Sequence, residues 1–275
     1  MVAHGESMNP TRPERRLRVN GVEMYCEVHG AGRPLVLLHG AMSTIQTSFG
    51  ALLPSLARTR QVVAVEQQAH GHTPDIDRPL TFEHMAADTA AVLRRLNIER
   101  ADLFGYSMGA GIALEIAIQH PDLVRRLVLA SLAYTREGLH PEIVEVIERT
   151  RPEDLAGSIF EKAYAKTAPN PENWPTLVAR CNQLDREFEG WRPEDVRSIE
   201  APTLVMIGDS DIVQPEHAVH IFRLLGGGVE GDSAGLPDSQ LALLPGTTHL
   251  TIVERADWVV SMVSGFLDPP LSHGG

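Results

Sequence analysis

Short, nearly continuous apolar runs alternate along the chain with segments whose apolar positions recur at helical spacing. Such runs are typical of strands that are covered on both faces. Strands are predicted over residues 15–19, 22–28, 35–38, 62–66, 102–105, 126–130, 203–207 and 241–244. Helices are predicted over residues 81–96, 108–120, 215–225 and 256–267. Asn20-Gly21 is a strong hairpin signal, so the first two strands should be antiparallel, and the later alternation favours a doubly wound, mostly parallel α/β sheet.

Three segments depart from this alternation. Residues 135–197 contain no strand signal and are too long for an ordinary connection, which predicts an inserted helical cap between two parts of a core, 15–134 and 198–275. Residues 226–240 are rich in Gly, Ser and Asp and predict a flexible loop. Residues 1–14 lack periodicity and are interpreted as a disordered leader.

Charge and composition narrow the class of protein. The 36 acidic side chains outnumber the 24 basic ones, and the net charge of −12 disfavours a nucleic-acid partner. Apolar runs fall well short of the roughly 18 residues that a membrane span needs, and the N-terminus lacks the apolar stretch of a signal peptide. The two cysteines, Cys26 and Cys181, match no zinc or redox spacing. We therefore expect a protein of a reducing compartment, in the cytoplasm and without a membrane partner.

The most specific motif is Gly105-Tyr106-Ser107-Met108-Gly109, a G-x-S-x-G sequence between a predicted strand and a predicted helix. A serine hydroxyl is a weak nucleophile, so it must project from a sharp turn where a base can reach it. Flanking glycines remove the Cβ clashes of such a turn, and the following helix N-terminus favours negative charge. The motif identifies Ser107 as a candidate nucleophile.

Four motifs occur in a fixed order. A strand at 35–38 is followed by His39-Gly40-Ala41-Met42, then by residues 105–109, 208–215 and 245–250. In this order the chain resembles the α/β-hydrolase family over nearly all of its length after residue 15. The resemblance implies an α/β-hydrolase fold with an eight-stranded sheet, helices on both faces and an inserted cap.

The resemblance also implies roles for individual residues, because the family's catalytic order is serine, acid, histidine. It points to Asp211 as the acid and to His249 as the general base, with Asp209 as a competing acid that otherwise accepts loop N–H bonds. It implies an oxyanion hole at the backbone N–H groups of Ala41 and Met108. No cofactor or metal is implied.

Candidate substrate contacts come from the loops around the motifs and from the aromatic residues of the cap. They are His39, Met42, Tyr106, Tyr164, Trp174 and Trp191. These residues favour a small to medium, largely apolar molecule. His70-Gly71-His72 with Asp75 is a weak metal-site candidate. The same loop, residues 66–73, has Ala69 where the family often has glycine.

A serine nucleophile argues against the family's dehalogenases and epoxide hydrolases, which use a carboxylate. Hydrolysis of a carboxylic ester, with a small-molecule ester as substrate, is the favoured hypothesis. One alternative is hydrolysis of a carbon–carbon bond, for which Arg180 could bind an acidic substrate, although Tyr106 stands where those enzymes often have asparagine. A noncatalytic ligand-binding protein of the same fold is the other alternative.

Overall fold

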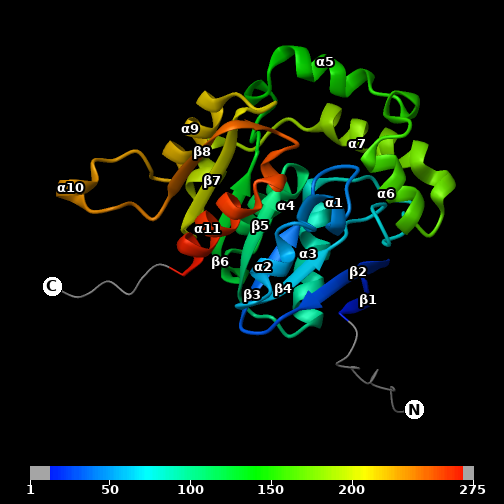
Figure 1. The fold of residues 1–275 in the computed structure, drawn as a ribbon, viewed down its shortest axis with the longest axis horizontal. Helices are drawn as coiled ribbons and strands as arrows, with labels where there is room; N and C mark the ends of the chain where they lie inside the picture. The colour runs from blue at the N-terminus through cyan, green and yellow to red at the C-terminus, as the bar shows by residue number, and fades with distance from the viewer. Residues whose placement is uncertain (1–12, 269–275) are drawn as a thin grey trace.

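The computed structural model describes residues 13–268, which fold around one eight-stranded sheet of order β1-β2-β4-β3-β5-β6-β7-β8 (Figure 1). Its strands are β1 (Glu14–Val19), β2 (Val22–His29), β3 (Arg33–Leu38), β4 (Arg60–Val65), β5 (Ala101–Tyr106), β6 (Val124–Ala130), β7 (Thr203–Ser210) and β8 (Gln240–Thr248). Strand β2 pairs antiparallel with β1 and β4, and the remaining neighbours pair in parallel. The predicted α/β-hydrolase sheet is thereby confirmed.

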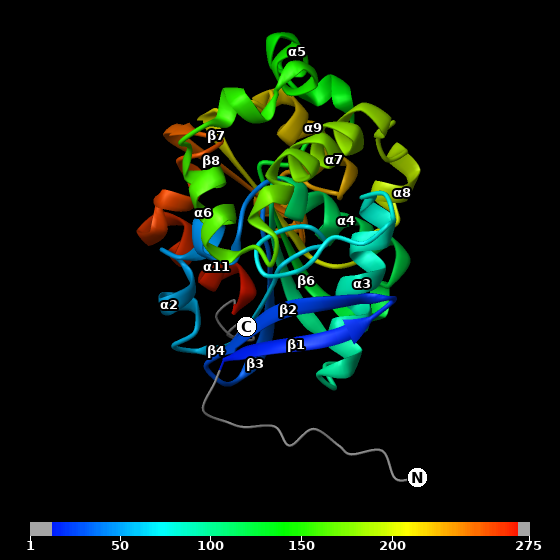
Figure 2. The same ribbon diagram turned by 90° about the vertical axis from the view of Figure 1, so that its right-hand side faces the viewer.

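The N-terminal hairpin forms one edge of the sheet (Figure 2). Its turn residues Asn20 and Gly21 both have positive φ, 46° and 88°, as the tight hairpin turn requires. The predicted disordered leader, residues 1–14, includes two residues that the structure describes as ordered, Pro13 and Glu14. Residues 1–12 lie outside the described residues, whereas the Pro13 carbonyl accepts a hydrogen bond from the Val28 N–H and Glu14 begins β1.

Alternating side chains of the strands supply two apolar cores, one on each face of the sheet. Val36 and Leu38 of β3 point into one core, and Leu35 and Leu37 point into the other. The core around Leu35 is covered by α1 (Ile45–Phe49), α2 (Leu53–Leu56) and α11 (Ala256–Leu267), and the core around Val36 by α3 (Phe82–Arg95), α4 (Met108–Gln119) and α9 (Pro215–Leu224). The inner strands β3 to β7 are therefore buried on both sides over most of their length, which is why their sequences contain continuous apolar runs.

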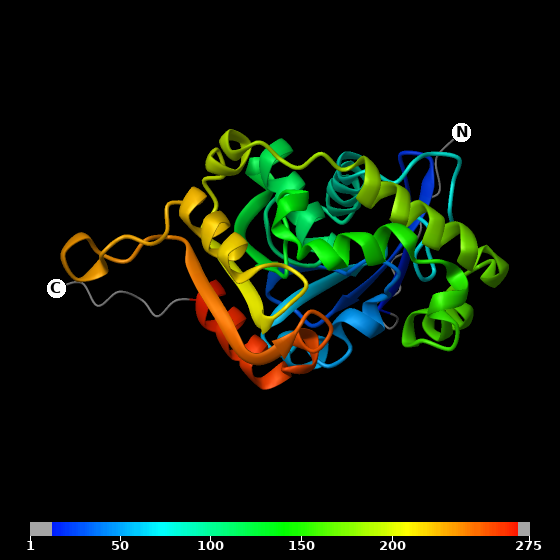
Figure 3. The same cartoon turned by 90° about the horizontal axis from the view of Figure 1, so that it is seen from above.

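The segment between β6 and β7 contains α5 (Pro141–Arg149), α6 (Ile159–Thr167), α7 (Trp174–Glu187) and α8 (Pro193–Arg197). Its first three helices lie together on one side of the sheet (Figures 1 and 3). Apolar residues of α7, such as Leu177 and Val178, belong to the same core as α3 and α4, so this helical insertion is packed onto the sheet domain.

Two strand ends and one loop differ from the sequence predictions. Strands β7 and β8 continue to Ser210 and Thr248, which pair with each other beyond an irregularity in register. The residues that extend these two strands form no apolar run, and most of them are exposed. The apolar pattern therefore ends before the strands do. The expected loop 226–240 contains a short helix, α10 (Gly231–Ala234), and projects away from the body (Figures 1 and 3). Within residues 13–268, no helix combines the length and hydropathy of a bilayer-crossing segment.

The contact between α4 and the sheet generates a stability prediction. A Cβ at Gly109 would lie 1.9 Å from the carbonyl oxygen of Leu38, whereas a Cβ at Gly265 on α11 meets no atom within 4 Å. Gly109→Ala should destabilise the fold by about 1–3 kcal/mol or more, because backbone must move. Gly265→Ala should stabilise it by up to about 1 kcal/mol, because alanine favours the helix. Urea denaturation followed by circular dichroism measures both, and an unchanged midpoint for Gly109→Ala would contradict the packing described.

Candidate active site

Ser107 occupies the turn between β5, which ends at Tyr106, and α4, which begins at Met108. Its backbone angles are φ 54° and ψ −122°, in a region that non-glycine residues rarely adopt. Glycine is required on both sides of the turn, since a Cβ at Gly105 would lie 2.1 Å from the Gly109 carbonyl oxygen. This close packing forces the Ser107 side chain outward, and it explains why the motif needs both of its glycines.

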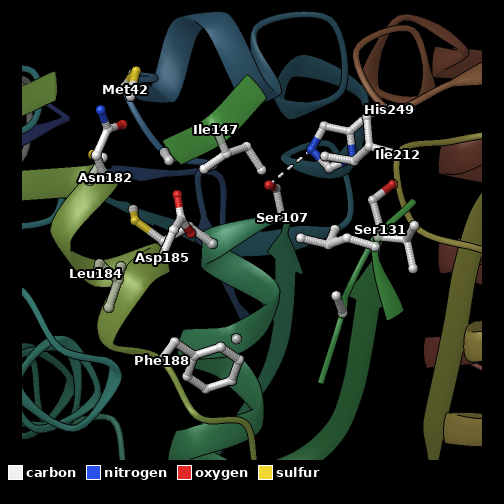
Figure 4. A pocket seen from close by; sticks show the side chains of 18 of the residues that line it. Met42, Ser107, Ser131, Ile147, Asn182, Leu184, Asp185, Phe188, Ile212 and His249 are labelled. Atoms are coloured by element: carbon white, nitrogen blue, oxygen red, sulfur yellow. Dashed lines mark hydrogen bonds between the residues drawn. The ribbon is translucent and has the colours of Figure 1, made fainter. Parts of the chain in front are cut away.

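Ser107, His249 and Asp211 form a continuous hydrogen-bonded chain. The Nε2 atom of His249 lies 3.0 Å from the Ser107 hydroxyl oxygen (Figure 4). Its Nδ1 atom lies 2.8 Å from Oδ1 of Asp211. The three residues follow different strands, β5, β7 and β8, whose carboxyl ends meet at one edge of the sheet. The structure thus brings together the three residues that the sequence nominates as a triad.

Asp211 is held as a buried carboxylate by three partners. Besides His249, the Ser131 hydroxyl donates to Oδ2 at 2.6 Å and the Val213 N–H donates to Oδ1 at 3.1 Å. Burial opposes the charge, but the hydrogen bonds and the nearby His249 outweigh it, so the pKa of Asp211 lies below its usual value. An ionised carboxylate at this position fixes the imidazole with Nδ1 protonated and Nε2 free to accept the serine proton.

Asp209, the competing acid, faces solvent and has a different partner set. Its two carboxylate oxygens accept hydrogen bonds from the N–H groups of Gly246 and Thr247 at the end of β8, and these bonds lower its pKa. Asp209 therefore accepts backbone N–H bonds, which is the noncatalytic role considered for it from the sequence. The donors belong to the adjacent strand β8 and not to its own turn. Its position keeps it away from the imidazole.

The two backbone groups nominated for the oxyanion hole border the same cavity as Ser107. Met108 is the first residue of α4, so its N–H has no acceptor within the helix. Ala41 follows the end of β3, and its neighbour Met42 has a positive φ of 56°. The Met42 N–H donates to Nε2 of His70 at 3.1 Å, which holds this loop in place.

His39 and His70 are buried supports rather than substrate contacts or metal ligands. His39, expected to contact substrate, does not line the cavity: Nδ1 faces the Gly40 carbonyl oxygen at 2.8 Å, and Nε2 accepts from the Gln67 N–H at 3.0 Å. Burial lowers the pKa of both histidines to about 4, with His70 contributing to the shift of His39, so both rings are neutral. Among the described residues no group of three or more side chains could hold a metal ion.

The loop at residues 66–73 contains an alanine in a backbone conformation that favours glycine. Ala69 has a φ of 66°, in the left-handed region that favours glycine. Ala69 therefore carries backbone strain in this loop.

A cavity of about 320 Å³ opens above Ser107 between the sheet edge and the helical insertion. Its wall is mostly apolar and includes Met42, Tyr106, Leu139, Val144, Ile147, Phe160, Leu184, Phe188 and Ile212. The predicted contacts Met42 and Tyr106 are thus at the cavity, and the Tyr106 hydroxyl donates to the His249 carbonyl oxygen at 2.8 Å. On the insertion side the wall combines aliphatic and phenylalanine side chains with the polar or charged residues Arg136, Glu148, Asn182 and Asp185.

Three aromatic residues expected to contact substrate lie elsewhere, which corrects that prediction. Tyr164, Trp174 and Trp191 are buried, and none of them lines the cavity. Tyr164 and Trp174 pack on each other at 5.5 Å between ring centroids, and Trp191 Nε1 donates to Oε2 of Glu115 on α4 at 2.5 Å. These side chains attach the insertion to the core, so aromatic character alone was a poor guide to the cavity wall.

The loop that bears Asp211 is bonded to the start of the helical insertion. The His140 N–H donates to the Ile212 carbonyl oxygen at 3.0 Å, and the Gln214 N–H donates to the Gly138 carbonyl oxygen at 2.8 Å. Leu139 and Val213 form an isolated antiparallel bridge between these bonds. The insertion and the acid loop therefore share one short backbone ladder.

Comparisons with known proteins identify the family of the chain. Residues 35–262 match the model of the alpha/beta hydrolase family. A 2-hydroxy-6-oxo-2,4-heptadienoate hydrolase of Pseudomonas putida is 26% identical, over 92% of this chain and 95% of that protein. Two solved structures share the fold at lower identity. A meta-cleavage product hydrolase from Pseudomonas fluorescens has a TM-score of 0.71 and 20% identity, over 90% of this chain and 94% of that one.

The second structure is a thermophilic esterase from Thermogutta terrifontis, with a TM-score of 0.70 and 22% identity over 94% of this chain and 98% of that one. The chain belongs to the alpha/beta hydrolase family.

Sequence reasoning missed Ser131 and most of the cavity wall. Ser131 directly follows β6, and the carboxyl ends of neighbouring parallel strands meet at one edge, so its place in the chain was a usable signal. The insertion residues that line the cavity carry no comparable signal, because helical periodicity does not say which face of a helix meets which neighbour.

Removing the Ser131 hydroxyl tests its support of Asp211. Ser131→Ala should lower the free energy of unfolding at pH 7 by about 1.5–3 kcal/mol, because a charged, buried acceptor loses a donor. A carboxylate whose pKa is lowered by folding stabilises the fold at pH values above its unfolded pKa, and this effect is lost as pH falls through its folded pKa. The loss of unfolding free energy in Ser131→Ala should therefore shrink in acid. Denaturant unfolding at pH 7 and pH 3.5 measures it.

Ser210→Ala is the matched control, because the Ser210 hydroxyl donates to the exposed Asp209. Its effect should stay within about 0.5 kcal/mol at both pH values. Equal deficits for the two variants, or a deficit for Ser131→Ala that does not depend on pH, would show that Ser131 does not support the charge on Asp211.

Proposed function

We propose that the protein is a serine hydrolase that cleaves carboxylic esters of small to medium, largely apolar molecules. The observation that carries this proposal is the bonded chain from Asp211 through His249 to Ser107, which opens into an apolar cavity. The cavity volume is near the lower end of the roughly 300–1,000 Å³ typical of small-molecule sites. A small-molecule ester substrate fits this size.

In the proposed reaction, His249 Nε2 takes the Ser107 proton while the hydroxyl oxygen attacks the ester carbonyl. The imidazolium that forms is stabilised by Asp211, and it then donates its proton to the leaving alcohol. The resulting acyl-enzyme is hydrolysed by water along the same path in reverse order. The N–H groups of Ala41 and Met108 would bind the oxyanion, and losing one such donor typically costs about 2.7–4 kcal/mol in the barrier.

The helical insertion, residues 135–197, is proposed to act as a cap over this site. Its residues Leu139, Val144, Ile147 and Phe188 contribute apolar wall to the cavity. A cap of this kind excludes bulk water from the acyl group while leaving one face open, which suits substrates of limited length.

Cleavage of a carbon–carbon bond is the second candidate, and the name of the Pseudomonas putida relative favours it. That name describes a carboxylate substrate, a dienoate, which would need a cation. Arg136 is the one arginine or lysine among the described residues of the cavity wall, and it is already paired with Glu148. Arg180, the cation considered from the sequence, is bonded to Asp75 at 2.6 Å outside the cavity. Ester hydrolysis therefore ranks first.

A fluorophosphonate probe tests the nucleophile. We expect one covalent adduct on Ser107, because the neighbouring base makes this hydroxyl reactive. Mass spectrometry should find no adduct on Ser107→Ala and a strongly reduced rate for His249→Ala. Ser210→Ala, a control outside the cavity, should react like the unmodified protein. A native protein that forms no adduct would instead support a noncatalytic binding role.

Turnover of two substrate sets separates the two hydrolase candidates. The protein should hydrolyse p-nitrophenyl esters with short to medium acyl chains, and activity should fall for chains too long for the cavity. A vinylogous 1,5-diketone should be cleaved far more slowly. Release of p-nitrophenol and loss of diketone absorbance are the measurements, with Ser107→Ala as the blank. Turnover of the diketone alone would reverse the ranking.

A further inference from the structure

Asp185 is a charged residue in an otherwise apolar part of the cavity wall. It lies near the end of α7, and Figure 4 shows its carboxylate on the opposite side of Ser107 from His249, turned toward the same space as the serine hydroxyl. The surface that the side chain exposes faces the cavity. Leu184 and Phe188, its apolar neighbours on the same chain segment, also line this space.

No hydrogen bond or ion pair from any residue in the described range, 13–268, reaches the Asp185 carboxylate. Arg136 is near enough to influence it but is bonded to Glu148 on α5. Within the cavity wall the charges of Arg136 and Glu148 cancel, which leaves Asp185 as the uncompensated charge.

The Asp185 side chain exposes surface at the cavity, yet the surrounding protein reduces its contact with bulk water. Burial raises the pKa of Asp185 to about 6, against the opposing influence of Arg136 and Arg186. The buried carboxylate of Asp211, which has three partners, shows the opposite shift. Asp185 thus presents to the cavity a carboxylate without the protein partners that hold Asp211, which leaves it available to a group supplied from outside the chain.

We propose that Asp185 is a specificity-determining residue that binds a cationic, hydrogen-bond-donating group of the substrate, above all a primary ammonium, and disfavours carboxylate substrates. The inference rests on the proposed function in taking the cavity as the substrate site. It deepens that function by assigning a charge to the substrate class. Opposite charges in a site of low dielectric attract strongly, and a charge-assisted bond adds direction.

Competition between matched probes tests the proposal. Hydrolysis of p-nitrophenyl butyrate, a neutral ester, serves as the reporter at pH 7.5, and n-hexylamine, 1-hexanol and hexanoate serve as inhibitors of equal chain length. We expect the ammonium to inhibit at a concentration about 10-fold or more below that of the alcohol, and hexanoate to be the weakest. In Asp185→Asn the three inhibition constants should converge.

Glu187→Gln is the control variant, because it removes the same charge from α7 at an exposed position outside the cavity wall. It should keep the native order of inhibitors. Equal inhibition of the native protein by all three probes, or convergence in both variants, would overturn the proposal. Calorimetric titration of hexylammonium into Ser107→Ala measures the same preference without turnover, so a failure to hydrolyse the reporter would contradict the proposed function and leave this test intact.

Stability provides a second readout, which a structural role would not produce. A carboxylate whose folded pKa is raised destabilises the fold increasingly as pH rises from its unfolded to its folded pKa. Asp185→Asn should therefore raise the Tm at pH 7.5 and leave it nearly unchanged at pH 4.5. A lower Tm at both pH values would identify Asp185 as a structural residue.

The preference for hexylammonium should also weaken below about pH 6, as Asp185 is protonated. The other charged or titratable groups around the site are Arg136, Glu148 and Arg186 near Asp185, and His249 with Asp211 across the cavity. Calorimetry on Ser107→Ala at pH 7.5 and pH 5 isolates binding from the catalytic use of His249. A preference that is equal at both pH values would count against the assigned charge.

Discussion

The close approach of α4 to the sheet is the constraint on which the site depends. The Leu38 carbonyl oxygen on β3 occupies the space where a side chain at residue 109 would begin, so the helix can start this near the strand only with glycine there. That proximity bends the chain sharply at Ser107 and holds its φ at 54°. If the helix moved outward by even one methyl group, the turn would relax and the hydroxyl would leave the imidazole.

Asp209 and Asp211 show how burial divides one residue type between two tasks. Asp209 and Asp211 are two positions apart on the same loop, yet one faces solvent and ties the ends of β7 and β8 together, while the other is enclosed and bonded to His249, Ser131 and the Val213 N–H. The charge of Asp211 persists in a poor dielectric because each partner donates to it. Asp185 lacks such donors. For this reason we assign Asp211 to orienting His249 and propose Asp185 for binding the substrate.

Sequence patterns predict this molecule best where geometry is local or imposed by the sheet. The apolar runs located every strand, and G-x-S-x-G located the turn, because both reflect packing that only a few residue types allow. The ends of β7 and β8 were missed because their polar residues have no periodic burial. Tyr164, Trp174 and Trp191 were misplaced because an aromatic ring on an amphipathic helix packs equally well against the core or against a cavity. Ser131 and Asp185 depend on contacts between segments about 80 residues or more apart along the chain, which no local pattern records.

The backbone ladder between residues 138–140 and 212–214 has a mechanical consequence. The start of the insertion is hydrogen-bonded to the loop that bears Asp211. A movement of that segment would therefore displace the Asp211 carboxylate from His249. If the insertion acts as the proposed cap, an entrance that leaves the catalytic groups aligned has to form away from this ladder, among α5, α6 and α7. The attachment of the proposed cap is thus also a support of the Asp211–His249 pair, and the entrance would lie on the opposite rim.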